Sequence, residues 1–207
     1  MAKKIRIAIQ QKGRLREASI EYLASCGLEF SVSNTRSLIA SCLNEPVELI
    51  FVRNSDIPKY VAFGVADFGI VGENVLYEQD ADLPVVGKLD FGRCALVIAA
   101  PVDGSINALN DLNHERIATK YPNSLKKFLS SHNVDASIVE LKGSVEIAPS
   151  LGLADAICDI TQTGGTLKEH DLIVIEKILD SQAVLIESPF EKEVKASFKS
   201  RVLRKDI

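Results

Sequence analysis

The stretch AICDITQTGGTL, residues 156–167, places an apolar run directly before a loop of threonines and glycines. The run at 156–160 predicts a strand that carries an aspartate near its end, and the loop stands where a helix would open. Strands that alternate with helices in this way are typical of α/β folds. The stretch therefore indicates the fold class, and its loop raises the question of a ligand.

Two interpretations of the loop stay open from these residues alone. It can be a Gly-Gly turn with a threonine N-cap for the next helix. It can also be a phosphate cradle, because glycines let backbone N–H groups approach an anion, hydroxyls add donors and a helix N-terminus favours negative charge. Asp159 would then accept hydrogen bonds from sugar hydroxyls. The loop is not a Walker loop, since no lysine follows the glycines, and it does not match G-x-G-x-x-G.

The same alternation of strands and helices runs along the whole chain. Ile5, Ile7 and Ile9 alternate with other residues and predict an opening strand, and apolar residues spaced by three and four from Leu15 predict a helix that ends near Gly27. Further strands are predicted at 47–52, 66–72, 83–89, 94–100, 116–119, 136–141, 171–178 and 182–188. Further helices are predicted at 55–64 (capped by Ser55 or Asp56), 123–132, 144–153 and 190–204.

The length of 207 residues is long for one domain and short for two full ones. We therefore expect two lobes, with a boundary at the turn GKLDFGR, residues 87–93. The first lobe is expected to comprise 1–88 plus about 175–207, and the second 89–174, which carries the Thr/Gly loop. Ligands of such folds favour the crevice at the carboxyl ends of strands, here expected between the lobes.

Charge and hydropathy exclude several classes of function. The net charge of −4 is spread over both signs without long runs, so no nucleic-acid or membrane surface is predicted. The first apolar run is too short for a signal peptide, and no run approaches a membrane span. We expect a cytoplasmic protein.

No protein-bound metal site is predicted. The cysteines lack a C-x-x-C pair and are expected to be reduced and mostly buried, and the histidines show no i,i+4 pairing; these residues are Cys26, Cys42, Cys94, Cys158, His114, His132 and His170.

A longer pattern surrounds the Thr/Gly loop. The segment EIAPSLGLADAICDITQTGGTL, residues 146–167, fills every specified position of E-x5-G-x-[small]-x2-[IV]-x-D-[aliphatic]-x2-[ST]-G-x-T-[LM]. That pattern is the signature of ATP phosphoribosyltransferases, and the chain resembles this family. The resemblance extends in order to KGRL (12–15), RNSDIPKYVAFGVADFGIVG (53–72), LDFGRCALVIAAP (89–101) and RIATKYPN (116–123).

The resemblance implies an activity. Enzymes of this family transfer the phosphoribosyl group of 5-phosphoribosyl pyrophosphate (PRPP) to N1 of ATP, giving phosphoribosyl-ATP and pyrophosphate in the first step of L-histidine biosynthesis. Mg²⁺ accompanies the substrate polyphosphates. The family fold has two lobes like those of periplasmic binding proteins of type II, with the active site in the cleft between them. Adenine N1 carries no proton, so positioning and electrostatic stabilisation should dominate catalysis.

The resemblance also implies roles for residues of this chain. The loop residues Thr161, Thr163, Gly164, Gly165 and Thr166 would hold the 5-phosphate of PRPP. Asp159 and Glu146 would bind the ribose hydroxyls.

Cations near the first strand are expected to meet the leaving group. Lys12 and Arg14 stand at a strand-to-helix turn, and Arg36 is a further candidate; the family uses such groups on the pyrophosphate. The alternative is that they are solvated surface cations. Arg53 and Asp56 would frame the nucleotide, although Asp56 is equally suited to be only a helix cap. Asp90 and Arg93 are weaker candidates, balanced against a structural turn.

The chain stops at SRVLRKDI, where long members of the family begin a histidine-binding regulatory domain. The resemblance therefore implies a short form without that domain. Short forms pair with a catalytically inactive relative of histidyl-tRNA synthetase, commonly in a hetero-octamer. Two competing functions are a binding module of the periplasmic type and a phosphoribosyltransferase for another base.

Overall fold

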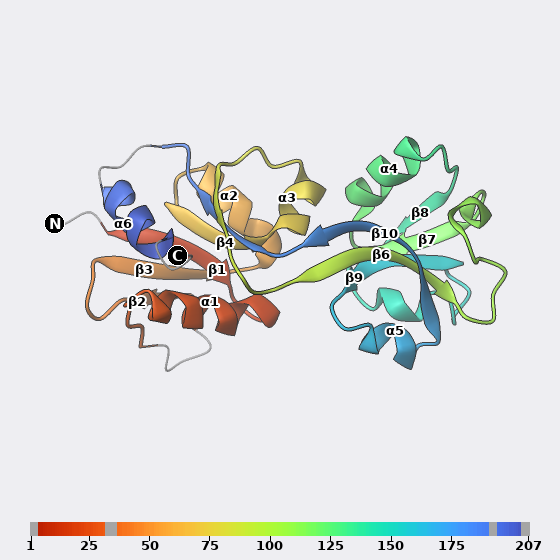
Figure 1. Ribbon diagram of the computed structural model, residues 1–207, viewed down its shortest axis with the longest axis horizontal. Helices are drawn as coiled ribbons and strands as arrows, with labels where there is room; N and C mark the ends of the chain where they lie inside the picture. Colours follow the sequence, from red (N-terminus) through yellow and green to blue (C-terminus); the bar gives the residue numbers. More distant parts are fainter. Residues whose placement is uncertain (1–3, 32–36, 191–193, 204–207) are drawn as a thin grey trace. The chain divides into compact units, whose positions relative to one another are not determined.

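The computed structural model describes residues 4–31, 37–190 and 194–203 (Figure 1). The chain forms two compact units. One comprises the residues up to Leu76, Asp80–Gly92 and the residues from Gln182 onward, and the other comprises Tyr77–Gln79 and Arg93–Ser181. The expected boundaries at 88/89 and about 175 thus lie a few residues before the observed ones.

The first unit is built on a six-stranded sheet in the order β2-β3-β1-β4-β11-β5. Three central strands are parallel: β1 (Ile5–Gln10), β3 (Val47–Val52) and β4 (Phe68–Gly72). The others run antiparallel to their partners: β2 (Ile39–Ser41) to β3, and β11 (Ala183–Glu187) to both β4 and β5 (Val85–Lys88). A strand from late in the chain therefore lies inside the sheet (Figure 1).

Helices cover both faces of this sheet. Ile5, Ile7 and Ile9 share one buried cluster with α1 (Arg14–Ser25) and α6 (Val194–Leu203), which confirms the predicted period-two alternation. Ala8 points to the opposite face, into a cluster with α2 (Ile57–Ala62) and α3 (Glu73–Gln79).

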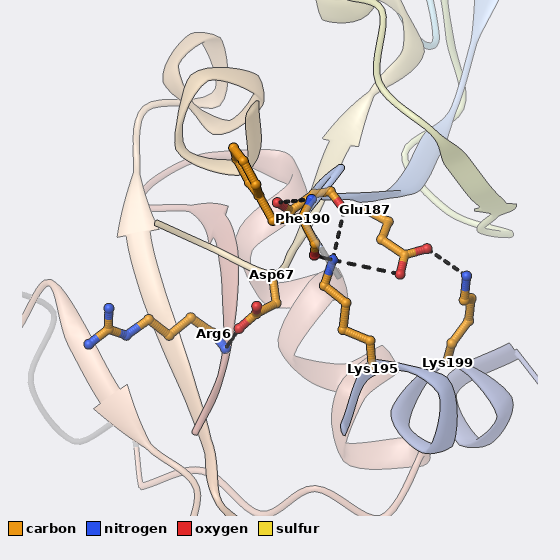
Figure 2. A network of polar contacts seen from close by, with 7 residues as sticks. Arg6, Asp67, Glu187, Phe190, Lys195 and Lys199 are labelled. Carbon is orange, nitrogen blue, oxygen red and sulfur yellow. Dashed lines mark hydrogen bonds and ion pairs between the residues drawn. The ribbon is translucent and has the colours of Figure 1, made fainter. Parts of the chain in front are cut away.

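Buried charge fixes α6 to this unit, as Figure 2 shows. Lys195 is only 4% exposed, and its Nζ donates to the carbonyl oxygens of Ser188, at 2.7 Å, and Phe190. The carboxylate of Glu187 forms ion pairs with both lysines of the helix: Lys195 Nζ lies 3.8 Å from Oε1, and Lys199 Nζ lies 2.5 Å from Oε2. The helix is thus held by polar contacts as well as by its buried Phe198 and Val202.

The second unit is a five-stranded sheet in the order β10-β6-β9-β7-β8. Its parallel strands are β7 (Arg116–Thr119), β8 (Ser137–Glu140) and β9 (Ala156–Thr161), and β6 (Cys94–Pro101) pairs antiparallel with β9 and with β10 (Leu172–Ser181). The helix α4 (Pro122–Ser131) packs on one face, and α5 (Gly165–Glu169) with the 3₁₀ turn η3 (Val145–Ile147) packs on the other.

The start of α4 is capped from a distance. The carboxylate of Glu78 accepts the N–H groups of Asn123 at 3.0 Å and Ser124 at 2.8 Å. These are donors that a helix N-terminus leaves without intrahelical partners. The end of α3 therefore belongs with the second unit.

Three local expectations were wrong. The helix predicted at 144–153 is only the turn η3, because Pro149 offers no N–H and Gly152 adopts a left-handed φ of +70°.

No side chain caps α2, although Ser55 or Asp56 was expected to. The 3₁₀ turn η1 (Asn54–Asp56) precedes α2 instead, and Asn54 O accepts the N–H of Ile57. Of the four free cysteines only Cys158 is fully buried.

Some elements have no counterpart in the expectations: β2, α3 and the 3₁₀ turn η2 (Leu109–Leu112). Among the helices of the described ranges, none has the length and apolar character needed to cross a membrane.

Candidate functional site

The Thr/Gly loop follows the carboxyl end of β9 in the second unit. Gly164 is the N-cap of α5 with a left-handed φ of +77°, a conformation that favours glycine. The hydroxyl of Thr161 accepts the N–H of Gly164 at 3.1 Å, and buried Leu167 anchors the far end of the loop. The threonine N-cap of the turn interpretation is therefore not formed, because glycine occupies the cap.

The outer part of the loop is exposed. Thr163, Gly165 and Thr166 lie on the surface, and no hydrogen bond joins the Thr163 or Thr166 hydroxyl to another described residue. A side chain built at Gly164 would meet no atom within 4 Å. The loop thus offers free hydroxyls and accessible backbone, which are the groups that an anionic ligand needs.

Asp159 lies two residues before the end of β9, with its side chain 16% exposed. Its Oδ1 accepts the N–H of Ile160 at 2.8 Å, and its Oδ2 lies 2.9 Å from Nζ of Lys120. Sequence reasoning did not single out Lys120. It directly follows β7, which is the parallel neighbour of β9, so its position at a carboxyl strand end was the available signal.

Glu146 lies on η3, half-buried, beside buried Val145. Because β7, β8 and β9 are parallel, the residues that follow them start from one edge of the sheet. The segment after β8 therefore leaves the edge that also carries Asp159 and the loop, and η3 contacts β9.

The remaining signature positions have structural explanations. The carbonyl oxygen of Gly152 accepts from Arg116 Nη1 at 3.1 Å, and Ala154 is buried. Arg116 also donates hydrogen bonds to both carboxylate oxygens of Asp155. These hydrogen bonds lower the pKa of Asp155, although burial acts in the opposite direction. These contacts fix the chain where it enters β9.

In the first unit the predicted cations also gather at a carboxyl edge. Gln11 N–H donates to Val52 O at 2.7 Å, so the turn after β1 lies beside the end of β3. Lys12 is exposed on that turn, Arg14 is exposed at the start of α1, and exposed Arg53 directly follows β3. The structure therefore brings these three cations to one edge.

The turn after β1 has a defined backbone. Gly13 is the N-cap of α1 with φ +106°, and a Cβ there would come 2.6 Å from Gln10 Nε2. Gln10 Oε1 accepts the N–H of Leu15 at 3.3 Å, which supports the first turn of the helix. The left-handed φ is what favours glycine here, because the Gln10 contact involves only the end of a flexible side chain.

The other predicted residues differ in their settings. Asp56 is half-buried at the end of η1, near Ser55 Oγ at 3.4 Å. Asp90 and Arg93 are exposed on either side of Gly92, whose φ of +68° marks a structural turn. Arg36 lies outside the described residues.

The chemistry of the site excludes a thiol nucleophile. Cys158 adjoins Asp159 in β9, but burial raises the pKa of its thiol to about 12. It is therefore protonated at neutral pH. Within the described ranges, no group of three His, Cys, Asp or Glu side chains could hold a metal ion.

A surface pocket of about 250 Å³ lies elsewhere in the second unit, with Pro101, Glu115 and Asp155 among its lining residues. These residues lie at the amino ends of β7 and β9 and at the end of antiparallel β6. The pocket is therefore at the opposite edge from the Thr/Gly loop.

Comparison with known proteins gives a consistent result. The family model HisG, ATP phosphoribosyltransferase, matches residues 53–205. The chain is 47% identical to an ATP phosphoribosyltransferase of Cytophaga hutchinsonii, over 91% of this chain and 66% of that protein. It is 45% identical to one of Maricaulis maris, over 90% of this chain and 65% of that protein. The chain thus spans just under two thirds of the length of these curated relatives.

Solved structures agree on the fold. The ATP phosphoribosyl transferase (HisG:HisZ) complex from Thermotoga maritima matches with TM-score 0.81 and 33% identity, over 97% of both chains. The periplasmic aliphatic sulphonate binding protein SsuA from Escherichia coli matches with TM-score 0.67 and 16% identity, over 99% of this chain and 71% of that one. The second likeness concerns the fold alone, and it confirms the expected resemblance to periplasmic binding proteins.

Proposed function

The chain belongs to the ATP phosphoribosyltransferase family, and we propose that it transfers the phosphoribosyl group of PRPP to N1 of ATP. The products are phosphoribosyl-ATP and pyrophosphate, and the reaction is the first step of L-histidine biosynthesis. One observation carries the proposal: the family signature coincides with a strand end that carries Asp159 and an exposed Thr/Gly loop.

The second unit would bind PRPP. Backbone and hydroxyl groups of the loop, from Thr161 to Thr166, receive the 5-phosphate, because they supply donors without a bulky side chain at Gly164 or Gly165. Asp159 accepts from the ribose hydroxyls, and Glu146 assists it from η3. Both carboxylates also place negative charge near a ribosyl carbon that becomes positive in the transition state.

The first unit would receive the leaving group and the nucleotide. Lys12 and Arg14 at the edge of β1 neutralise the charge that develops on pyrophosphate, with Arg36 as a further candidate. Arg53 and Asp56, which follow β3, frame the nucleotide.

No general base is needed in this reaction. Adenine N1 attacks with a free lone pair as the C1–pyrophosphate bond of PRPP breaks, and the electrons of that bond leave with pyrophosphate. Mg²⁺, bound through the substrate polyphosphates, would supply further charge neutralisation. The contribution of the chain is to orient the ribose and to stabilise the departing charge.

We also propose a regulatory partner. The Thermotoga maritima relative forms a complex named HisG:HisZ, which supports a HisZ-like subunit for this chain. The proposed assembly is a hetero-octamer, which rests on the family resemblance alone. Sedimentation of the chain with and without that subunit tests the assembly, and a lone monomer in both cases would contradict it. Both substrates are metabolites of the cytoplasm, which is the proposed location.

The test of the activity is product formation from ATP, PRPP and Mg²⁺, with and without the partner, followed by ultraviolet absorbance. We expect a rise in absorbance that requires all three components. PRPP or ATP binding without turnover would favour a binding module, and turnover with another base alone would favour a different phosphoribosyltransferase.

A further inference from the structure

The carboxylate of Asp159 is restrained at both of its oxygens. Ile160 N–H donates to Oδ1 at 2.8 Å, and the ammonium of Lys120 lies 2.9 Å from Oδ2. Two donors from different strand ends therefore define the plane of the carboxylate. A hydrogen-bonding group fixed in this way does not lose rotational freedom when it meets a ligand.

The backbone position of Lys120 is fixed by the hydrogen bonds of the preceding residue, Thr119. The hydroxyl of fully buried Thr119 donates to Cys158 O at 2.7 Å, and Thr119 Oγ1 accepts the N–H of Tyr121 at 2.8 Å. The carbonyl oxygen of Thr119 accepts Leu141 N–H at 2.9 Å. The backbone around Lys120 is therefore tied to β8 and β9, and its side chain extends beside Asp159.

The setting of the pair also distinguishes it from a surface ion pair. The side chains of Lys120 and Asp159 are 34% and 16% exposed, so solvent and salt screen their attraction less than that of fully exposed partners. Lys126, by contrast, is an exposed cation on α4.

We propose that Lys120 is a positioning residue of the phosphoribosyl transfer: its ammonium holds the Asp159 carboxylate in the orientation that accepts the ribose hydroxyls of PRPP. The inference rests on the proposed function. Its physical basis is preorganisation, since a contact whose geometry is set before binding stabilises the complex without an ordering cost. The competing possibility is that Lys120 contacts a PRPP phosphate directly.

The test compares four variants and one control variant with the wild-type chain in the presence of its partner. Lys120→Met removes the ammonium and keeps the apolar stem, and Lys120→Arg restores a cation. Asp159→Asn removes the charge of its partner, and the double variant completes a cycle. Lys126→Met is the matched control. KM for each substrate and kcat are measured from product absorbance, and PRPP binding is measured by calorimetry.

For Lys120→Met we expect KM for PRPP to rise about tenfold, with KM for ATP nearly unchanged. Lys120→Arg should recover most of the affinity, and Lys126→Met should match wild type. In the Asp159→Asn background, Lys120→Met should weaken PRPP binding by less than about twofold, because its effect acts through the carboxylate. A structural defect would not produce this substrate-selective and non-additive pattern.

Two results overturn the inference while leaving the proposed function intact. One is an unchanged KM for PRPP in Lys120→Met while the wild type forms product. The other is an effect of Lys120→Met on PRPP affinity that stays about tenfold in the Asp159→Asn background. That result would mean that Lys120 contacts a phosphate directly. If the wild type with its partner neither binds PRPP nor forms product, the proposed function and the inference fail together.

Discussion

Nη2 of Arg116 lies 2.8 Å from Oδ1 of Asp155, at the point where the chain enters β9. The same guanidinium reaches Gly152 O, so it ties the signature segment to the start of β7. Hydrogen bonding from Arg116 lowers the pKa of Asp155. The stability of the unit that carries the Thr/Gly loop is therefore linked to pH.

The sign of this linkage is fixed by the direction of the shift. Because the pKa is lower in the folded state, the pair stabilises above the unfolded value of about 3.9, and this contribution is lost as pH falls through the folded value. Asp155→Asn should lower Tm by about 2 °C at pH 7, since the pair is only partly buried. The difference from wild type should shrink steadily as pH is lowered below that unfolded value. Calorimetry over a series of pH values measures it, with exposed Asp135→Asn as the control. A gap that persists at low pH would contradict the linkage.

Arg14→Ala tests the leaving-group role. A contact that stabilises transition-state charge is worth about 2–4 kcal/mol, so kcat/KM should fall by roughly 30- to 900-fold. Steady-state kinetics with saturating ATP measures this. Lys59→Ala, which removes an exposed cation from α2 of the same unit, should change little. Values of kcat/KM within a few-fold of wild type for Arg14→Ala would rule out the role.

Gly164→Val tests the phosphate cradle. The substitution places a branched side chain at a left-handed φ of +77° in the loop, so PRPP binding should be abolished while the protein stays folded. Gly27→Val is a matched control, because Gly27 has φ +84°, and a Cβ at either glycine meets no atom within 4 Å. Calorimetric titration with PRPP and circular dichroism separate the two effects. Retained affinity in Gly164→Val would exclude the cradle.

Lys195→Met tests the attachment of α6. The ammonium donates to two backbone carbonyls from a site that is 4% exposed, and losing it leaves those acceptors without their donor. The free energy of unfolding should fall by about 2 kcal/mol. Lys199→Met on the same helix should cost less than about 1 kcal/mol, since Lys199 is 37% exposed. Urea unfolding measures both, and equal losses would contradict the role of burial.

The predicted elements that the structure confirms are those with strong local patterns. The alternating isoleucines of β1 and the spaced apolar residues of α1 report which face is buried, so they can be read without knowing the partners. β2 has only three residues, too few to show a period. The cap of α4 could not be predicted, because Glu78 lies 45 residues before Asn123.

The residues of the candidate site also divide into those with a local sequence pattern and those that depend on a distant partner. The loop and Asp159 are contiguous in sequence, so their pattern is visible in one segment. Lys120 is different, because its partner lies 39 residues away on a strand that becomes its neighbour only in the folded sheet. A lone lysine after a short strand looks like a solvated cation until the order of β7 and β9 is known.

The position of β11 between β4 and β5 has a consequence for the order of folding during synthesis. All of Arg93–Ser181 leaves the ribosome before β11 does, so the strands of the second unit are available while the first sheet still lacks an inner member. Until β11 is synthesised, the sheet of β1, β3 and β4 has unpaired backbone N–H and C=O groups along β4. An unpaired edge strand of this kind is prone to pair with the wrong segment. Closure of that edge by β11 spans more than a hundred residues of chain, which makes it a slow, non-local step.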